Sequence, residues 1–206
     1  MRPPQAPPRD AVAPDERDDY DAVVARALGK FGRLPPYHAA LLNSPPFAAA
    51  LNAVGLVVRA AGKRPDSYSH AERELVDQVL SADFGTNVLQ RIHVPDAVAA
   101  GVRVEAIRAL RADDESGLSE DERQLAAYVR AVVSGSVADE QYEAIEARLG
   151  ARGAVEYTIF IAFLQMTIRL WQAFGMDDPS DAEIDATVAE LASGARDLDG
   201  FRKRIG

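Results

Sequence analysis

The sequence predicts an all-α protein, and three observations carry that prediction. Apolar residues recur at spacings of three and four along most of the chain, which places them on one face of successive helices. A serine followed three residues later by a glutamate, the capping-box pattern of a helix start, occurs at residues 69, 119 and 180. Alternating runs of β-branched residues bounded by turn signals are missing, so no sheet is expected.

The start signals predict where helices begin, and glycines just past the periodic segments predict where they end. We expect about eight or nine helices, near residues 19–31, 46–61, 69–84, 86–100, 103–111, 119–134, 138–149, 152–174 and 181–193. Pro95 is expected to kink or end the helix in which it lies, because proline lacks the backbone N–H.

Three segments are expected along the chain. Five of the first fourteen residues are proline, so residues 1–18 are predicted to form a disordered Pro-rich tail. Residues 19–176 hold the periodic helices and are predicted to form one helical domain. Residues 177–206 are rich in acidic side chains and are predicted to form an acidic C-terminal helix and tail.

Composition and charge exclude several classes of function. The chain has 206 residues, with 23 Lys and Arg against 32 Asp and Glu, a net charge of −9. This balance disfavours binding to nucleic acids or to anionic membranes. Neither a signal-peptide core nor an apolar run of membrane-spanning length is found, and a cytoplasmic location is expected. There is no cysteine, which excludes disulfides, thiolate metal sites and dithiol redox chemistry.

Of the three histidines, His93 is the best candidate for chemistry. His70 lies in the first turn of a capped helix and is expected at the surface. A tight turn around Gly85 would fold two helices into a hairpin and bring Glu74 within reach of His93. A carboxylate beside an imidazole raises the pKa of that imidazole and orients it for proton transfer. The alternative is a histidine and a glutamate that only satisfy each other inside a helix pair.

Several stretches together resemble the family of carboxymuconolactone decarboxylases and alkylhydroperoxidase D proteins. The similarity covers about residues 35–176 in order and rests on Asn43-Ser44-Pro45-Pro46, Arg73-Glu74-Leu75-Val76, His93-Val94-Pro95, Ala99-Ala100-Gly101-Val102 and the segment 163–169. The resemblance implies an alkylhydroperoxidase D-like helical bundle. It also implies a homo-oligomer, either a trimer, a hexamer or a dimer.

When the chain is aligned with the peroxidase branch of this family, the two positions of the thiols are taken by other residues. Counting from Glu74, the two cysteine positions are Thr86 and Leu89, and the histidine position is His93. A peroxidatic cycle needs one thiolate to attack the peroxide and a second thiol to resolve the sulfenic acid, so that route is excluded. Many cysteine-free relatives carry Tyr-Glu where this chain has Val88-Leu89, so a second acidic group of that branch is missing.

The resemblance therefore implies a cofactor-free acid/base enzyme that acts on a small organic acid or lactone, as the decarboxylases of the family do. It implies that His93 is the general acid/base and Glu74 its orienting partner. Thr86, Gln90 and Leu89 are expected to bind the substrate. Arg91 is a weaker candidate for binding a carboxylate.

Two other functions stay open, a catalytically silent helical oligomer that serves as a binding or assembly module and, less favoured, a thiol-independent peroxidase. No cofactor and no metal site is expected. The acidic residues at 177–185 lack the glycine and the terminal glutamate of a calcium-binding loop.

Overall fold

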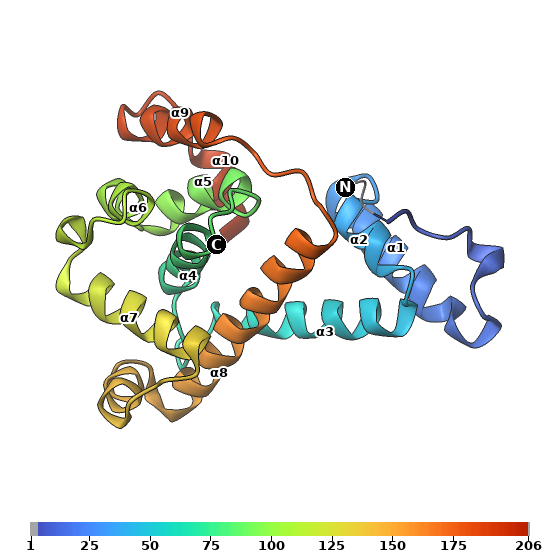
Figure 1. Ribbon diagram of the computed structural model, residues 1–206, viewed down its shortest axis with the longest axis horizontal. Helices are drawn as coiled ribbons and strands as arrows, with labels where there is room; N and C mark the ends of the chain where they lie inside the picture. Colours follow the sequence, from blue (N-terminus) through green and yellow to red (C-terminus); the bar gives the residue numbers. More distant parts are fainter. Residues whose placement is uncertain (1–3, 206) are drawn as a thin grey trace. The chain divides into compact units, whose positions relative to one another are not determined.

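The computed structural model describes residues 4–205, and over this range the chain is helical, with no strand (Figure 1). The prediction of an all-α protein is confirmed. The α-helices of this range are α1 (Arg17–Phe31), α2 (Pro36–Leu41), α3 (Pro45–Ala61), α4 (His70–Asp83), α5 (Gln90–Ala100), α6 (Val104–Arg111), α7 (Glu120–Ser134), α8 (Asp139–Ala173), α9 (Asp181–Ala192) and α10 (Asp199–Ile205). Short 3-10 turns form at η1 (Arg9–Ala11), η2 (Pro14–Glu16) and η3 (Glu115–Gly117).

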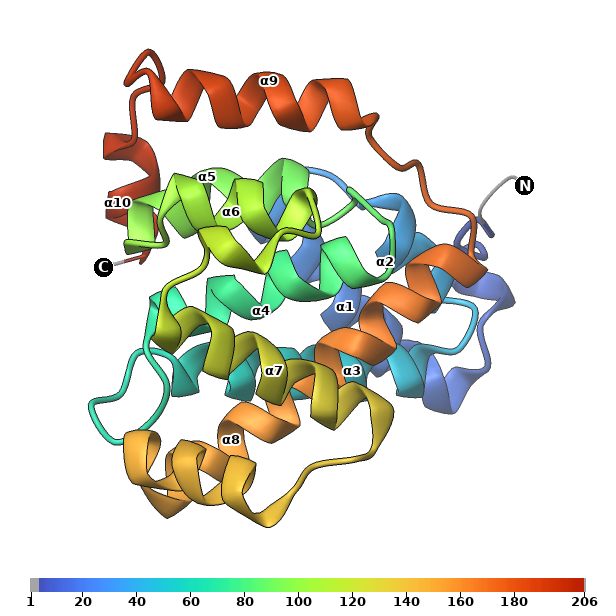
Figure 2. The same cartoon turned by 60° about the vertical axis from the view of Figure 1, so that its left-hand side comes forward.

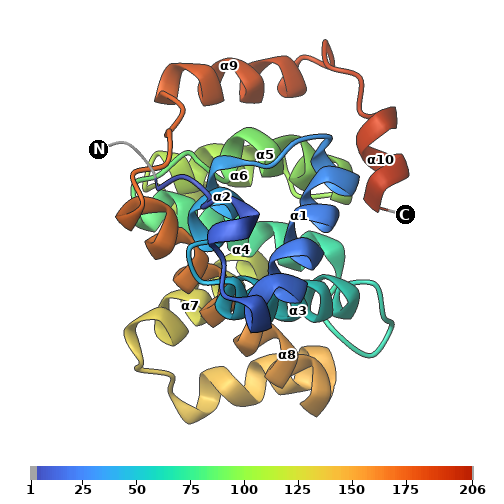
Figure 3. The same ribbon diagram turned by 90° about the vertical axis from the view of Figure 1, so that its right-hand side faces the viewer.

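The chain divides into two compact units, and the first consists of residues 1–59 and 166–176. Its core is formed by apolar side chains of α1, α2, α3 and the end of α8, namely Val23, Leu41, Leu42 and Ala48, with Leu170 and Phe174 packed against them. The N-terminal segment that precedes α1 holds η1 and η2, which are seen in front in Figure 3. Arg9 forms an ion pair with Asp21 of α1 at 2.7 Å, and the Tyr20 hydroxyl donates to the carbonyl of Pro7.

The second unit consists of residues 60–165 and 177–206, and α4 is its central helix. It packs against α5, α6 and α7, and its apolar residues Leu75, Val76, Val79 and Leu80 are buried. The aromatic rings of Tyr68, Tyr157 and Phe160 pack together in the same unit. Figure 2 shows α9 running along α5 and α6, with α10 next to α5. The acidic segment 177–206 thus enters this unit as a packed part of it.

The predicted helix starts at three serines are confirmed in atomic detail. Each of Ser69, Ser119 and Ser180 accepts a hydrogen bond from the backbone N–H three residues on. In return, the glutamate at that position accepts one from the backbone N–H of the serine. These reciprocal bonds satisfy amide groups that have no partner within the helix, which fixes where α4, α7 and α9 begin.

The structure corrects the start of the helix predicted at 86–100. Helix α5 begins at Gln90, because Gly85 has a left-handed φ of 59° and the N–H of Thr86 donates to the carbonyl of Ser81. Residues between Gly85 and α5 therefore form a turn. The predicted end is confirmed: the helix continues through Pro95 and ends at Ala100, with Gly101 as its C-cap at a φ of 105°. The sequence shows that Pro95 lacks a backbone N–H, but it does not show whether the helix continues past this residue.

The two helices predicted at 138–149 and 152–174 are joined in α8, with a break at Gly150, where φ is 72° and ψ is 165°. This helix is also long and apolar enough to cross a membrane by length and composition alone, and it is the one such helix within residues 4–205. The core helix of a soluble protein passes the same test, and Tyr157, Phe160, Ile161 and Leu164 of α8 are buried. The short helices α2 and α10 were not predicted, because six or seven residues are too few to show a helical period.

Candidate acid/base site

The site is built on the hairpin of α4 and α5 in the second unit. Nδ1 of His93, on α5, lies 2.9 Å from Oε2 of Glu74, on α4. The Glu74 side chain is completely buried, and that of His93 is 22% exposed. Its second ring nitrogen, Nε2, has no hydrogen-bond partner in the described part of the chain. His93 is therefore held at one nitrogen and available at the other.

Two basic side chains of α4 contact the other carboxylate oxygen of Glu74. Nη2 of Arg73 lies 2.5 Å from Oε1, and Nε2 of His70 lies 3.0 Å from the same atom. The His70 side chain is only 15% exposed, so the expectation that it lies at the surface is wrong. It is partly buried because the spacing of four residues on one helix turns it toward Glu74.

A second carboxylate stands beside the pair. Oδ2 of Asp77, which is 2% exposed, lies 3.7 Å from Nδ1 of His93. Two buried negative charges, on Glu74 and Asp77, thus face two basic groups, Arg73 and His93. Buried carboxylates of this kind need such partners to remain ionised.

These charges set the protonation states. Burial alone would lower the pKa of His93, but the negative charges of Asp77 and Glu74 and the hydrogen bond to Glu74 raise it to about 9. Burial alone would raise the pKa of Glu74. The positive charge of His93 and hydrogen bonds from His70 and His93 instead hold the pKa of this carboxyl far below its usual range. At neutral pH the imidazole of His93 is therefore protonated and the carboxylate of Glu74 is ionised. The imidazolium of His93 is the proton donor of this pair.

The atoms that Glu74, Asp77 and His93 offer lie within 4.8 Å of one another, close enough to be considered as ligands of a metal ion. The guanidinium of Arg73 already occupies one side of Glu74. A divalent cation would have to approach against this positive charge, so the surroundings fit a proton-carrying histidine better than a metal.

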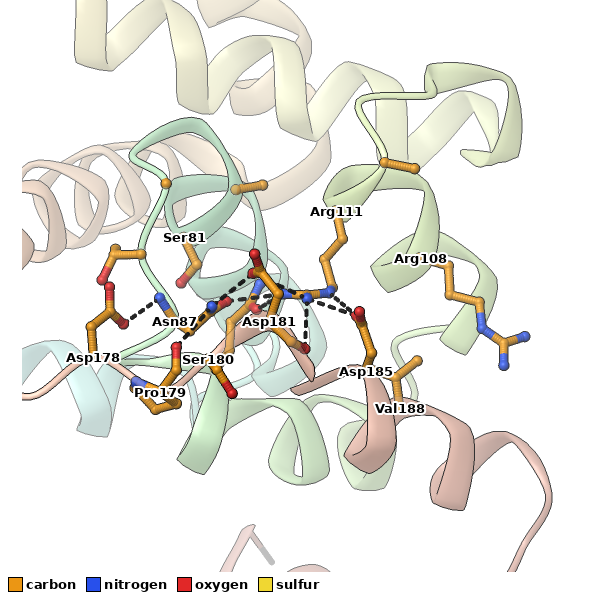
Figure 4. A pocket seen from close by; sticks show the side chains of 15 residues that line it. Ser81, Asn87, Arg108, Arg111, Asp178, Pro179, Ser180, Asp181, Asp185 and Val188 are labelled. Atoms are coloured by element: carbon orange, nitrogen blue, oxygen red, sulfur yellow. Dashed lines mark hydrogen bonds and ion pairs between the residues drawn. The ribbon is translucent and has the colours of Figure 1, made fainter. Parts of the chain in front are cut away.

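Two of the predicted substrate-binding residues line a cavity of about 910 Å³ in the second unit. Figure 4 labels other residues of the same cavity, among them Asn87 and Arg111. Thr86 forms part of its wall from the turn before α5, and Gln90 from the first residue of α5. Leu89 is 3% exposed and does not line the cavity, nor do Glu74 and His93. The structure therefore distributes the predicted residues over two neighbouring places on the same hairpin.

Several polar residues of this region were not identified from the sequence. Gln78 and Ser81 of α4 are buried, and their side-chain polar atoms have no hydrogen-bond partner within residues 4–205. Arg111 of α6 lines the cavity and bonds to residues far away in the sequence. The spacing of Asp77, Gln78 and Ser81 along α4 would have been a usable signal, since it puts these polar residues on the same helix face as Glu74. Arg91, the weaker candidate, is more than half exposed and lies 3.5 Å from Glu183 of α9.

Comparisons with known proteins support the fold. No protein-family model and no curated protein sequence matches this chain. Among solved structures, the chain is similar to an alkylhydroperoxidase AhpD core, an uncharacterized peroxidase-related protein from Ralstonia eutropha JMP134, with a TM-score of 0.61 and 17% sequence identity. The match covers 86% of this chain and 91% of that chain. The chain therefore has an AhpD-like helical fold.

Proposed function

We propose that this protein is a cofactor-free acid/base enzyme that acts on a small organic acid or lactone, with His93 as its proton donor. The observation that carries the proposal is the 2.9 Å contact between Nδ1 of His93 and the buried carboxylate of Glu74. This contact fixes the imidazole ring and keeps it protonated, while Nε2 stays available to a bound molecule.

In a decarboxylation, the bond between the carboxylate carbon and its neighbour breaks and CO₂ leaves. The electron pair is left on the substrate, where a carbonyl group delocalises it as an enolate. His93 would transfer the proton on Nε2 to this carbanion, and the neutral imidazole would then regain a proton from water. Glu74 is a positioning residue in this scheme, because it touches His93 and not the substrate.

The experiment measures CO₂ release from a panel of unsaturated γ-lactone carboxylic acids, with deuterium incorporation from heavy water as a second readout. We expect His93→Gln to abolish turnover and to remove the deuterium from the product. His38→Gln, in the other unit, changes the same residue type away from the site and should retain turnover. Turnover that survives in His93→Gln would contradict the proposal.

A second function, an assembly module without catalysis, is favoured by one specific observation. Helix α3 exposes large apolar side chains, with Phe47 72% and Val57 64% exposed. Light scattering after gel filtration would show whether the protein forms oligomers and whether Phe47→Ser dissociates them. An oligomer that dissociates, together with no turnover on any substrate of the panel, would favour this second function.

A further inference from the structure

The cavity beside the α4–α5 turn contains an arginine held in a fixed position. The guanidinium of Arg111 donates hydrogen bonds to the side-chain oxygens of Asn87, at 3.0 Å, and of Gln90. Gln90 is 1% exposed, and the Arg111 side chain is 13% exposed. Neutral amides hold the guanidinium from one side, and its other donors face Asp185, to which dashed lines join them in Figure 4.

The walls of this cavity differ in charge according to the segment that supplies them. The polar side chains from α4, the turn and α6 are neutral or positive, namely Ser81, Thr86, Asn87, Gln90, Arg108 and Arg111. The carboxylates all come from the start of the acidic C-terminal segment, namely Asp178, Asp181 and Asp185. Without that segment, the remaining polar walls would offer an anion several donors and no negative charge.

Asp185 occupies the outward donors of Arg111. Its Oδ1 accepts hydrogen bonds from Nε at 3.0 Å and from Nη2 at 2.7 Å. The Asp185 side chain is nevertheless 66% exposed, and that of Asp181, 3.5 Å from Arg111, is 82% exposed. Ion pairs with such exposed partners contribute little to stability, so a carboxylate from solution can compete for the same donors.

Two further groups in the cavity have no partner within the described range. The hydroxyl of Ser81 is buried, with the residue 2% exposed, and makes no hydrogen bond there. Arg108, one turn before Arg111 on α6, is exposed and forms no ion pair in the described part of the chain; it points away from the hydrogen-bonded network in Figure 4. A bound molecule in the cavity can supply the partner that this buried hydroxyl lacks.

We propose that this cavity is a binding site for a small dicarboxylate and that Asp185 takes the place of one of its carboxylates when the site is free. One carboxylate of the ligand replaces Asp185 on Arg111, and the second pairs with Arg108, whose exposed side chain rotates toward the cavity. The Ser81 hydroxyl donates to the ligand from the cavity wall. A volume of about 910 Å³ accommodates a ligand of this size. The proposal does not depend on His93, which does not line the cavity.

The first experiment titrates the intact protein with succinate and with succinamide, its neutral diamide of the same size, by isothermal titration calorimetry at constant ionic strength. We expect succinate to bind and succinamide to bind much more weakly, because guanidinium groups recognise the charged carboxylate. The proposal is overturned if succinate does not bind, or if the two compounds bind equally well.

The second experiment tests the competition by Asp185. Asp185→Asn removes the competing charge, and we expect it to bind succinate about two- to fivefold more tightly than the unchanged protein. Glu190→Gln is the matched control, since Glu190 lies on the same helix and outside the cavity. Equal affinities in Asp185→Asn and Glu190→Gln would overturn the role of Asp185.

A third comparison, made in the Asp185→Asn background, adds Arg111→Lys. Lysine keeps the positive charge but loses the two-pronged geometry, and we expect about tenfold weaker succinate binding. Far-UV circular dichroism checks that both variants keep their helix content. His93→Gln should bind succinate like the unchanged protein, so the outcome is separate from that of the catalytic proposal.

Discussion

Oε2 of Glu74 lies 2.9 Å from Nδ1 of His93, although the two residues are nineteen positions apart in the sequence. The contact exists because α4 and α5 pack against each other around the turn at Gly85. Glu74 is buried completely, and its charge is balanced by His93 and Arg73. This relationship fixes both the orientation and the protonation of the histidine, and two of the predictions below test it directly.

Replacement of Glu74 by Gln should lower the pKa of His93 well below about 9, because it removes a negative charge in contact with the imidazole. NMR titration of the histidine ring signals measures this pKa. Glu72→Gln is the control, since Glu72 lies on the same helix and pairs with Arg148 instead. A histidine in Glu74→Gln that still titrates near pH 9 would refute the assignment of Glu74 as the positioning residue.

The stability of the protein should fall as the pH rises from about 6.5 to about 9. His93 keeps its proton in the native state up to about pH 9, whereas in the unfolded chain it loses it near its ordinary value of 6.5. The native state therefore binds more protons in this window, and the free energy of unfolding decreases with pH by at most about 1.4 kcal/mol per pH unit. Urea unfolding at several pH values measures the slope, and in His93→Gln the slope should be reduced.

His38 should produce the opposite dependence on the acid side. Burial, together with the positive charges of Lys30, Arg59 and Arg26, lowers the pKa of His38 to about 4. Between pH 6.5 and pH 4 the unfolded chain takes up a proton that the native state does not, so acid destabilises the fold in this window. Removal of this titration in His38→Gln should flatten the acid side of the stability curve. An unchanged acid slope would show that the pKa of His38 is the same in the native and the unfolded state.

Gly150→Ala should destabilise the protein by about 1–3 kcal/mol. Gly150 has φ 72° and ψ 165°, a backbone conformation that is nearly restricted to glycine. Gly29, inside α1, provides the control, because a Cβ there meets no atom within 4 Å and its φ is not positive. Gly29→Ala should stabilise by about 0.5–1 kcal/mol through helix propensity. Thermal unfolding compares the two, and equal effects would contradict the strained break in α8.

The protein should not consume hydrogen peroxide or an organic hydroperoxide at a rate above that of buffer. The chain has no cysteine, so it has no thiol that could form a sulfenic acid. A peroxide-clearance assay with a thiol reductant present checks this expectation. Peroxide consumption that requires the protein would contradict this prediction and favour the alternative of a thiol-independent peroxidase.

The sequence predicts the longer helices but not the short helices α2 and α10, nor the surroundings of the site. Capping boxes at Ser69, Ser119 and Ser180 act within four residues, so their pattern can be read directly. The start of α5 could not be read, because the turn after Gly85 is fixed by a bond from Thr86 to Ser81 rather than by apolar spacing. A glycine after a periodic segment also occurs both at a break inside a helix and at a boundary between two helices. The sequence therefore could not show which of the two Gly150 marks.

The sequence also places Glu74 within reach of His93, because both lie on one short hairpin. It does not indicate that Asp185 pairs with Arg111, since 74 residues separate them. An ion pair between residues that lie far apart in the sequence produces no periodic pattern that could predict it. His70 shows the same limit at short range, because a position in the first turn of a helix does not say which neighbour the side chain meets.

The packing of α9 on α5 and α6 has a consequence for biosynthesis. A chain is made from its N-terminus, so α4, α5 and α6 are complete before Asp185 leaves the ribosome. Until then, the surface that Ile184, Val188 and Leu191 later cover is open to water, and Arg111 lacks its carboxylate partner. The nascent chain therefore passes through a stage at which chaperones can reach this apolar surface and free anions can reach Arg111 without competition.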